Sequence, residues 1–181
     1  MASSRSFEDL ILPWLDAGYN LARWLLRDEA AAEDVLQDAC LSAFRHLDSL
    51  RGEDARPWFL RIVRNACYGW IEARQGRPEQ GGWEDEELEH LQAAAGQVGN
   101  DPLAALDREQ TRRHLDEAIR ALSPGLREVL VLREIEGLEY TEIAAVAAIP
   151  VGTVMSRLSR ARERMRLALA AYAGGAAKGQ G

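Results

Sequence analysis

Residues 74–101 separate the chain into two parts, because no helix or strand pattern runs through them. The segment collects Gly, Gln, Pro and acidic residues, a composition that favours a flexible linker. On both sides of it, apolar residues recur at helical spacing, and Ala, Leu, Glu and Arg outnumber β-branched residues. The sequence therefore predicts an all-α protein of two small helical domains, residues 5–73 and 102–173, joined by a flexible acidic linker and followed by a disordered tail at 174–181.

The first domain is expected to contain three or four helices. Its first pattern, from Phe7 to Leu25, is one-sided and contains Pro13. Either a short lead-in precedes a helix with Pro13 in its first turn, or a single helix is kinked at that residue. Two more helices are expected over about residues 30–47 and 56–73.

The second domain is expected to begin near Pro102, since Pro suits the first turn of a helix. Ser123 followed by a Pro predicts the start of the next helix, which ends at Gly137. Thr141 is placed to cap a short helix that runs through Ala147.

That short helix, a tight turn at Ile149-Pro150 and a long helix to about Tyr172 have the layout of a helix-turn-helix, whose second helix enters the DNA major groove. One stripe of the long helix is apolar and faces the core. The opposite arc carries small hydroxyl and Arg side chains near its amino-terminal end, which fits entry into a groove. A polar face that meets only water remains the alternative.

The helix expected over residues 30–47 has an acidic face with an apolar residue in its midst. Glu33, Asp34, Gln37 and Asp38 surround Leu41. Acidic side chains repel phosphate, so this face is not a DNA surface, and its apolar centre favours contact with another protein. A solvated acidic face with one exposed Leu is the alternative.

The formal net charge of −7 is unusual for a DNA-binding protein, but the charge is segregated along the chain. Two basic stretches, residues 56–77 and 151–168, each hold five Arg and one Glu. The first stretch mixes Arg with aromatic residues, as surfaces that bind single-stranded DNA do. We expect Trp58 and Phe59 in the core and leave Tyr68 open between core and surface.

Three segments of the sequence, quoted next in chain order, resemble regions of the extracytoplasmic-function sigma factors of the sigma-70 superfamily. EAAAEDVLQDACLSAFRHLDSL resembles region 2.2, GEDARPWFLRIVRNACYGWIEARQGR resembles regions 2.3 and 2.4, and LSPGLREVLVLREIEGLEYTEIAAVAAIPVGTVMSRLSRARERM resembles region 4. The resemblance implies a cytoplasmic, non-catalytic subunit that directs RNA polymerase to promoters, with an anti-sigma factor as a further partner.

The resemblance also implies the roles of individual residues. The face around Leu41 would dock on the clamp helices of the largest subunit of core RNA polymerase. The candidates for the minus-ten element of promoter DNA are Arg51, Arg61, Arg64, Asn65 and Tyr68. The candidates for the minus-thirty-five element are Thr153, Met155, Ser156, Arg157 and Arg160, with Arg133 and Tyr140 on phosphates. Ala148 stands at a turn position that the family often fills with Gly, where a left-handed Ala costs about 1 kcal/mol.

Other classes of function are weakly supported. No signal peptide or membrane span is expected, because no apolar run is long enough. The three His lie on separate segments, so we expect no catalytic site, metal or cofactor. Cys40 and Cys67 are interpreted as small buried hydrophobes, with a redox switch as the alternative. A stand-alone helix-turn-helix regulator and a helical protein adaptor remain competing hypotheses.

Overall fold

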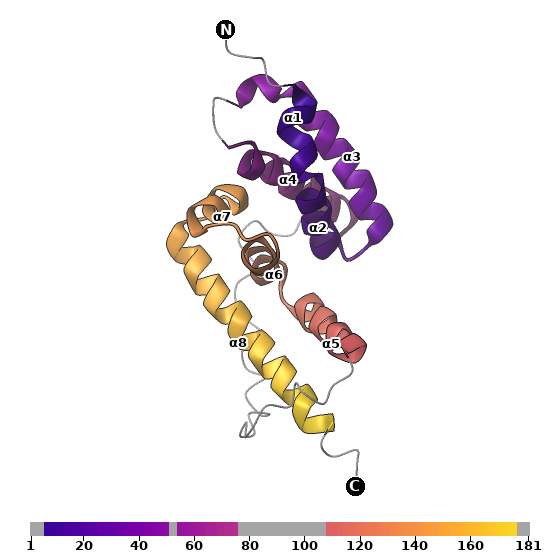
Figure 1. Ribbon diagram of the computed structural model, residues 1–181, viewed down its shortest axis with the longest axis vertical. Coiled ribbons are helices and arrows are strands. Elements are labelled where there is room, and N and C mark those ends of the chain that lie inside the picture. The colour runs from indigo at the N-terminus through magenta and orange to yellow at the C-terminus, as the bar shows by residue number, and fades with distance from the viewer. Residues whose placement is uncertain (1–5, 51–53, 76–107, 177–181) are drawn as a thin grey trace.

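The computed structural model describes residues 6–50, 54–75 and 108–176, and every regular element within these ranges is helical (Figure 1). The amino-terminal domain is built from four α-helices and a short 3-10 turn that separates the first two. Their bounds are α1 (Phe7–Ile11), η1 (Leu12–Trp14), α2 (Leu15–Leu26), α3 (Glu29–Arg45) and α4 (Ala55–Gln75), with a further 3-10 turn η2 (Leu47–Ser49).

A short lead-in, α1, does precede the longer helix, but Pro13 lies in the 3-10 turn η1 before α2 and not, as expected from the sequence, in the first turn of α2. Ser6 caps α1 by accepting a hydrogen bond from the backbone N–H of Asp9, whose carboxylate accepts one from the N–H of Ser6. Asp28 caps α3 by accepting a hydrogen bond from the backbone N–H of Ala31, at 3.0 Å. The cap at Asp28 starts α3 at Glu29, one residue earlier than periodicity alone predicts.

Helices α2, α3 and α4 pack closely because small residues lie between them. The buried face of α3 consists of Ala31, Ala32, Val35, Ala39 and Ala43. On α2, Gly18 faces Phe59 so closely that an added Cβ would lie 2.9 Å from the Cε1 atom of that ring. Phe59 is fully buried, as expected, while Trp58 is half-buried and packs against the core.

The carboxy-terminal domain contains a helix-turn-helix. Its elements are α5 (Arg108–Ala121), α6 (Pro124–Leu130), the π-turn η5 (Val131–Ile135), α7 (Tyr140–Ala147) and α8 (Val151–Ala176). Ser123 and Pro124 begin α6 as expected, and Gly137 has a left-handed φ of +69° after η5. Pro102 and the expected start of this domain lie outside the described residues.

The prediction that Thr141 caps α7 is wrong. Glu139 is the cap, and its backbone N–H donates to the carboxylate of Glu142 at 2.7 Å, so Thr141 lies inside the first turn. The prediction for Ala148 is confirmed, since its φ of 55° and ψ of 43° place it in the left-handed region at the turn before α8.

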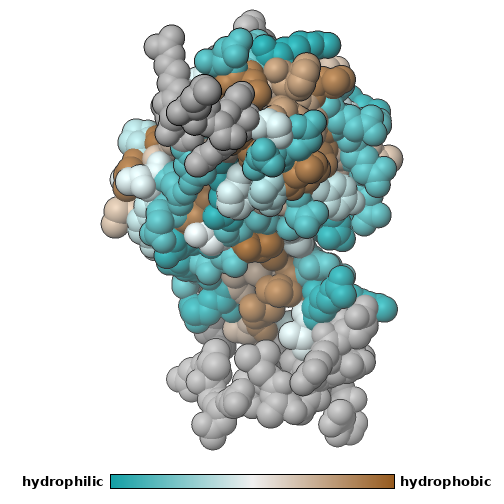
Figure 2. Space-filling model, turned by 45° about the horizontal axis from the view of Figure 1, so that its top comes forward, coloured by the Kyte–Doolittle hydropathy of each residue, from teal (hydrophilic) through white to brown (hydrophobic). Residues whose placement is uncertain are grey.

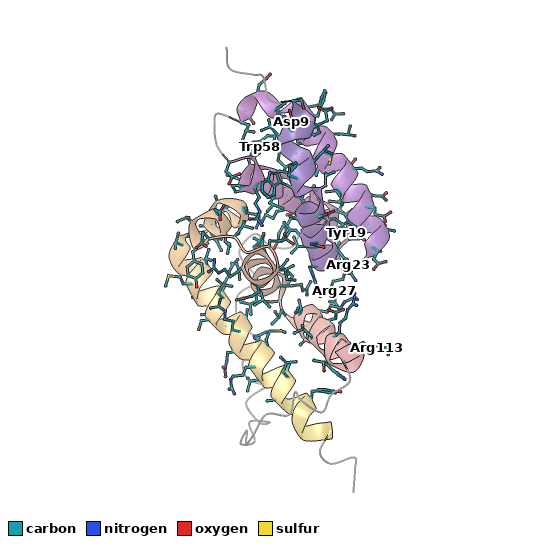
Figure 3. All side chains as sticks on the ribbon, in the orientation of Figure 1. Asp9, Tyr19, Arg23, Arg27, Trp58 and Arg113 are labelled. Atoms are coloured by element: carbon teal, nitrogen blue, oxygen red, sulfur yellow. The ribbon has the colours of Figure 1, made fainter. Side chains whose placement is uncertain are left out.

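The two domains pack against each other. α4 contacts α7, and α2 contacts α6 and η5, so that one hydrophobic core runs from the amino-terminal domain into the helix-turn-helix (Figure 1). Side chains fill the space between the two halves (Figure 3). A smaller apolar cluster joins α5, α6 and α8, and Trp24 packs against both cores. The structure is therefore a closed arrangement of the two domains.

Candidate nucleic-acid and protein interfaces

The acidic face of α3 is open to solvent. Glu33, Asp34, Gln37 and Asp38 are all exposed, and the side chain of Leu41 is 54% exposed. Within the described part of the chain, no basic side chain forms an ion pair with these acids. The structure thus brings all five candidate polymerase-binding residues together on one surface.

Sequence reasoning missed two exposed apolar residues of the amino-terminal domain. Phe44 follows Leu41 by one helical turn and is 64% exposed, with its ring 5.4 Å from that of Phe7 in an edge-to-face contact. Leu12, in η1, is 56% exposed. The spacing of three residues between Leu41 and Phe44 could have predicted that both lie on the same face of the helix. On the face drawn in Figure 2, hydrophilic side chains predominate, with several hydrophobic patches between them.

The minus-ten candidates on α4 fall into two groups. Arg61 and Asn65 are exposed. Arg64 and Tyr68 instead point into the boundary between the domains, where both contact Glu128 of α6. Arg51 lies outside the described residues.

Glu128 is the centre of a polar cluster between the domains. Its side chain is 0% exposed, and it accepts hydrogen bonds from Arg64 Nε at 2.7 Å and from the Tyr68 hydroxyl at 3.2 Å. The Arg64 guanidinium also stacks 4.3 Å from the centre of the Tyr68 ring. We name Arg64, Tyr68 and Glu128 the Glu128 cluster.

The ionisation of this cluster follows from its burial. Burial raises the pKa of Tyr68, and the charge of Glu128 raises it further, so the phenol stays protonated and donates its hydrogen. Burial acts to lower the pKa of Arg64, but pairing with Glu128 prevails and raises it. Arg64 is therefore a cation at neutral pH, and its positive charge faces a carboxylate in place of solvent.

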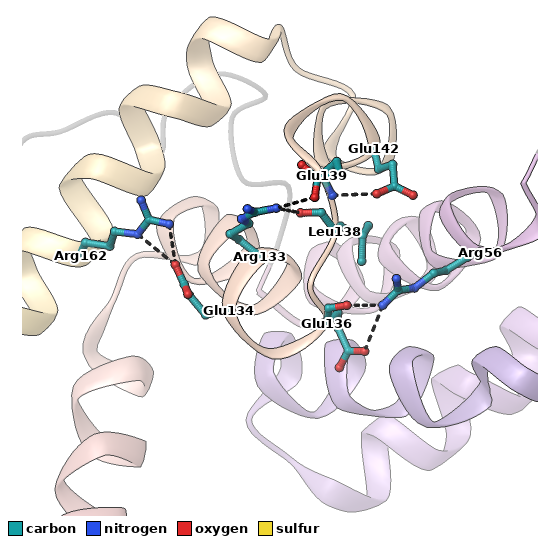
Figure 4. Close-up of polar contacts among 8 residues, drawn as sticks. All are labelled: Arg56, Arg133, Glu134, Glu136, Leu138, Glu139, Glu142 and Arg162. Carbon is teal, nitrogen blue, oxygen red and sulfur yellow. Dashed lines mark hydrogen bonds and ion pairs between the residues drawn. The ribbon is translucent and has the colours of Figure 1, made fainter.

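A second polar cluster crosses the same boundary (Figure 4). The Arg56 guanidinium donates to the backbone carbonyl of Glu136 and lies 4.0 Å from its carboxylate. Asn20 Nδ2 donates to the same carboxylate at 3.1 Å. In both clusters, an acid of the carboxy-terminal domain holds polar side chains of the amino-terminal domain.

Arg127, next to Glu128, is a buried arginine that the sequence did not single out. Its guanidinium donates to the backbone carbonyls of Ile119, Arg120 and Leu122 at the end of α5, at 3.2, 2.9 and 2.6 Å. A fourth bond, at 3.2 Å, reaches the carbonyl of Trp24 near the end of α2. Burial lowers the pKa of Arg127 to about 10, which still leaves it charged at neutral pH.

The minus-thirty-five candidates lie on or beside the amino-terminal half of α8. Met155, Ser156 and Arg160 are exposed, and Thr153 is half-buried. The Ser156 hydroxyl donates to the backbone carbonyl of Thr153 at 3.0 Å. Gly152 has open space around it, since an added Cβ would meet no atom within 4 Å.

Arg157 differs from its neighbours on α8 because it points toward the domain boundary. Its guanidinium lies against Gly125, where an added Cβ would be 3.1 Å from Arg157 Nη1. Burial raises the pKa values of Glu128 and Tyr68, and the positive charge of Arg157 acts against that rise in both. The charges of a minus-ten candidate, Arg64, and of a minus-thirty-five candidate, Arg157, thus both act on the buried Glu128.

Arg133 and Tyr140 form part of the support for the helix-turn-helix. Arg133 Nη1 donates to the Leu138 carbonyl at 2.7 Å and pairs with Glu139 at 3.2 Å (Figure 4). Its guanidinium also lies 5.1 Å from the centre of the Tyr140 ring. These contacts brace the loop before α7. Tyr140 also borders an open hollow on the surface, lined further by Met155, Ser159, Arg162, Glu163 and Arg166.

The two cysteines are free thiols. Cys67 is fully buried and Cys40 half-buried, which fits their interpretation as small hydrophobes. Burial raises the pKa of Cys67 to about 12 and also raises that of Cys40, so both thiols are poorly ionised at neutral pH.

Among the described side chains, no group of three or more His, Cys, Asp or Glu is arranged to hold a metal ion. Over the same residues, no single helix is long and apolar enough to cross a bilayer, and α7 with α8 meets that test only as a pair bent by 100°.

Comparison with known proteins assigns both domains. The model of Sigma-70 region 2 matches residues 9–77, and that of Sigma-70, region 4 matches residues 112–165. The RNA polymerase sigma-H factor of Pseudomonas aeruginosa is 35% identical over 167 residues, which cover 91% of this chain and 86% of that protein. The ECF RNA polymerase sigma-E factor of Escherichia coli K12 is 38% identical over 133 residues, covering 72% of this chain and 69% of that protein.

Two solved structures align with most of the chain. The sigma factor RpoE, in complex with the anti-sigma factor NepR from Bartonella quintana, aligns with a TM-score of 0.67 at 27% identity, covering 90% of this chain and 96% of that one. CnrH, in complex with the cytosolic domain of CnrY, aligns with a TM-score of 0.64 at 26% identity, covering 94% and 91%. The chain therefore belongs to the extracytoplasmic-function sigma factors of the sigma-70 family.

Proposed function

We propose that this sigma factor divides its work among three surfaces. The acidic face of α3 binds core RNA polymerase, α4 binds the minus-ten element, and the amino-terminal half of α8 binds the minus-thirty-five element. The observation that carries the proposal is the separation of charge: exposed carboxylates gather on α3, while arginines gather on α4 and α8. The chain needs no catalytic group, because the polymerase, with which it acts in the cytoplasm, performs the chemistry.

The polymerase surface is proposed to combine attraction with apolar anchoring. Carboxylates at Glu33, Asp34 and Asp38 steer a basic partner and repel DNA. Leu41 and Phe44 are more than half exposed, and burying large apolar side chains supplies most of the affinity at protein interfaces. The clamp helices of the largest polymerase subunit are the partner that we assign to this face.

The DNA surfaces are proposed to differ in chemistry because their targets differ. On α4, Arg61 and Asn65 hold the separated strand of the minus-ten element, where cations track the phosphates. On α8, Arg160 grips a guanine edge or a phosphate, and exposed Met155 contacts a thymine methyl group. One good base contact contributes about 1–3 kcal/mol of discrimination against the wrong base. A few such contacts on each of the two surfaces are therefore enough to select a promoter.

Charge reversal tests the polymerase surface. The double variant Glu33→Lys, Asp34→Lys should weaken binding to core polymerase at least about tenfold and reduce run-off transcription in parallel, because close charges at an interface couple strongly. The matched control, Asp16→Lys with Glu117→Lys, makes the same change in net charge at two exposed acids on α2 and α5, outside the acidic face of α3, and should bind normally. Equal binding by both double variants would refute the assignment of this face.

We also propose that an anti-sigma factor controls this protein. The solved structures of RpoE and CnrH similar to this chain hold NepR and the cytosolic domain of CnrY, respectively. Each of the two alignments spans both domains, so a partner able to contact both would keep them together. Purification of the tagged protein from its native host should yield a protein that blocks run-off transcription when added back. Recovery of polymerase subunits alone would count against this control.

A further inference from the structure

The closed arrangement uses side chains that promoter binding also needs. Arg64 and Tyr68 are minus-ten candidates, yet both donate hydrogen bonds to Glu128 across the domain boundary. Only 20% of the Arg64 side chain is exposed in this pairing. A carboxylate offers an arginine the same kind of charged oxygen acceptors that a phosphate offers. Glu128 therefore competes with DNA for the same donors.

The minus-thirty-five surface is affected by the same carboxylate. Arg157 is half-buried against Gly125 of α6, within its own domain, and its charge acts on the buried Glu128. The body of the helix-turn-helix adds to the obstruction, since α7 packs directly on α4. A strand of DNA cannot approach the Arg64 and Tyr68 face of α4 while α6 and α7 cover it.

We propose that the closed arrangement is autoinhibitory, and that Glu128 holds it by pairing with Arg64 and Tyr68 until the two domains separate. The proposal rests on the function assigned above to α4 and α8. Separation would release both side chains for DNA and would expose the Glu128 carboxylate to water. The Glu136 contacts with Arg56 and Asn20 hold the same boundary at a second point.

The boundary combines an apolar core, which resists opening, with two polar clusters whose side chains can be hydrated once the domains separate. When a carboxylate and a guanidinium separate, water hydrates both charges. This hydration offsets the loss of the ion pair, so the free-energy cost of opening these contacts is moderate. Apolar side chains gain no such favourable hydration when they are exposed to water. Replacing one partner while the domains stay closed, by contrast, leaves a buried polar group without its pair, which favours the open form.

Two variants of opposite charge change test this inference. Glu128→Gln removes a negative charge from the Glu128 cluster, and Asn20→Asp adds one against the Glu136 carboxylate. Neither residue belongs to the proposed DNA or polymerase surfaces. Glu134→Gln is the matched control, because it removes a carboxylate that pairs only within the carboxy-terminal domain, with Arg162 at 2.6 Å.

The assays use the full chain without polymerase. Small-angle X-ray scattering reports the radius of gyration, and fluorescence anisotropy reports binding to a single-stranded oligonucleotide with the non-template minus-ten sequence. Both Glu128→Gln and Asn20→Asp should expand the protein and tighten oligonucleotide binding about tenfold, because apparent affinity scales with the fraction of the binding-competent form. If oligonucleotide binding depended only on the net charge of the protein, Glu128→Gln would bind more tightly and Asn20→Asp more weakly. The control Glu134→Gln should match the wild type in both assays.

Wild-type dimensions and wild-type affinity in both variants would overturn the inference. If circular dichroism shows that Glu128→Gln does not fold, Asn20→Asp alone decides, because Asn20 is only partly buried. Run-off transcription with core polymerase separates this outcome from a failure of the proposed function. A wild-type protein that transcribes while its variants stay closed refutes autoinhibition alone, and a wild-type protein that gives no promoter-specific transcript refutes the assigned DNA surfaces.

Discussion

Replacing Arg127 with Met should destabilise the fold strongly. Arg127 is 3% exposed and donates four hydrogen bonds to carbonyls, at 2.6–3.2 Å. Three of these carbonyls belong to the end of α5, where a helix leaves its last C=O groups without partners. Met fills a similar volume but leaves these acceptors unpaired in a site that excludes water.

The expected cost is smaller than the sum of four bonds. Hydrogen bonds from a charged donor contribute about 1.5–3 kcal/mol each, but removing the guanidinium also removes the penalty for burying its charge. The lowered pKa of Arg127, about 10, reflects that penalty. The net effect resembles the loss of one partner from a buried ion pair. We therefore expect Arg127→Met to lower the free energy of unfolding by about 3–5 kcal/mol. For a chain of this size that corresponds to a fall in Tm of about 6–20 °C.

Thermal unfolding followed by circular dichroism measures the effect. Arg127→Lys keeps the charge but cannot reach four carbonyls with one ammonium group, so it should lose at least about 2 kcal/mol. Arg23→Met is the control, because Arg23 makes only a partly exposed pair with Glu29 at 3.4 Å and should lose less than about 1 kcal/mol. A Tm for Arg127→Met within about 2 °C of the wild type would refute this reasoning.

Two further predictions concern backbone geometry and packing. Ala148→Gly should stabilise the protein by about 1 kcal/mol without altering DNA affinity, because Gly adopts the left-handed φ of 55° without strain; urea unfolding that shows no gain would contradict it. Gly18→Ala should destabilise by about 1–3 kcal/mol through overlap with Phe59, whereas Gly69→Ala, which meets nothing within 4 Å on α4, should stabilise by about 0.5–1 kcal/mol. Equal effects at the two glycines would show that packing around Gly18 relaxes freely.

Local signals in the sequence were sufficient to predict the helices, but they did not predict every residue that caps a helix. The periodicity around α3 and α4 predicts helices close to Glu29–Arg45 and Ala55–Gln75, because burial of one face decides where a helix lies. At α7 the usual preference for a hydroxyl cap favoured Thr141, but Glu139 caps through reciprocal bonds with Glu142. The two glutamates satisfy the backbone N–H groups of residues 139 and 142, whereas a Thr141 cap would have served N–H groups two or three residues after itself.

The contacts between the domains could not be predicted from periodicity. A pattern identifies the face of a helix that is buried, but not the element that buries it or the polar partner that a buried charge finds. One signal was present: Arg127 and Glu128 interrupt the apolar run from Leu126 to Leu132. A helix that is apolar on all sides is buried on all sides, so charged residues within it need partners from other elements.

The closed arrangement has a consequence for the order of assembly. The acidic face of α3 lies away from the helix-turn-helix and stays exposed while α4 is covered (Figure 1). Core polymerase therefore has access to its proposed surface before promoter DNA has access to Arg64 and Tyr68. If polymerase binds the open form more tightly than the closed form, its differential affinity supplies the free energy that separates the domains. Under the autoinhibition that we propose, free sigma factor does not occupy promoters, and recognition of the minus-ten element begins only in the complex with polymerase.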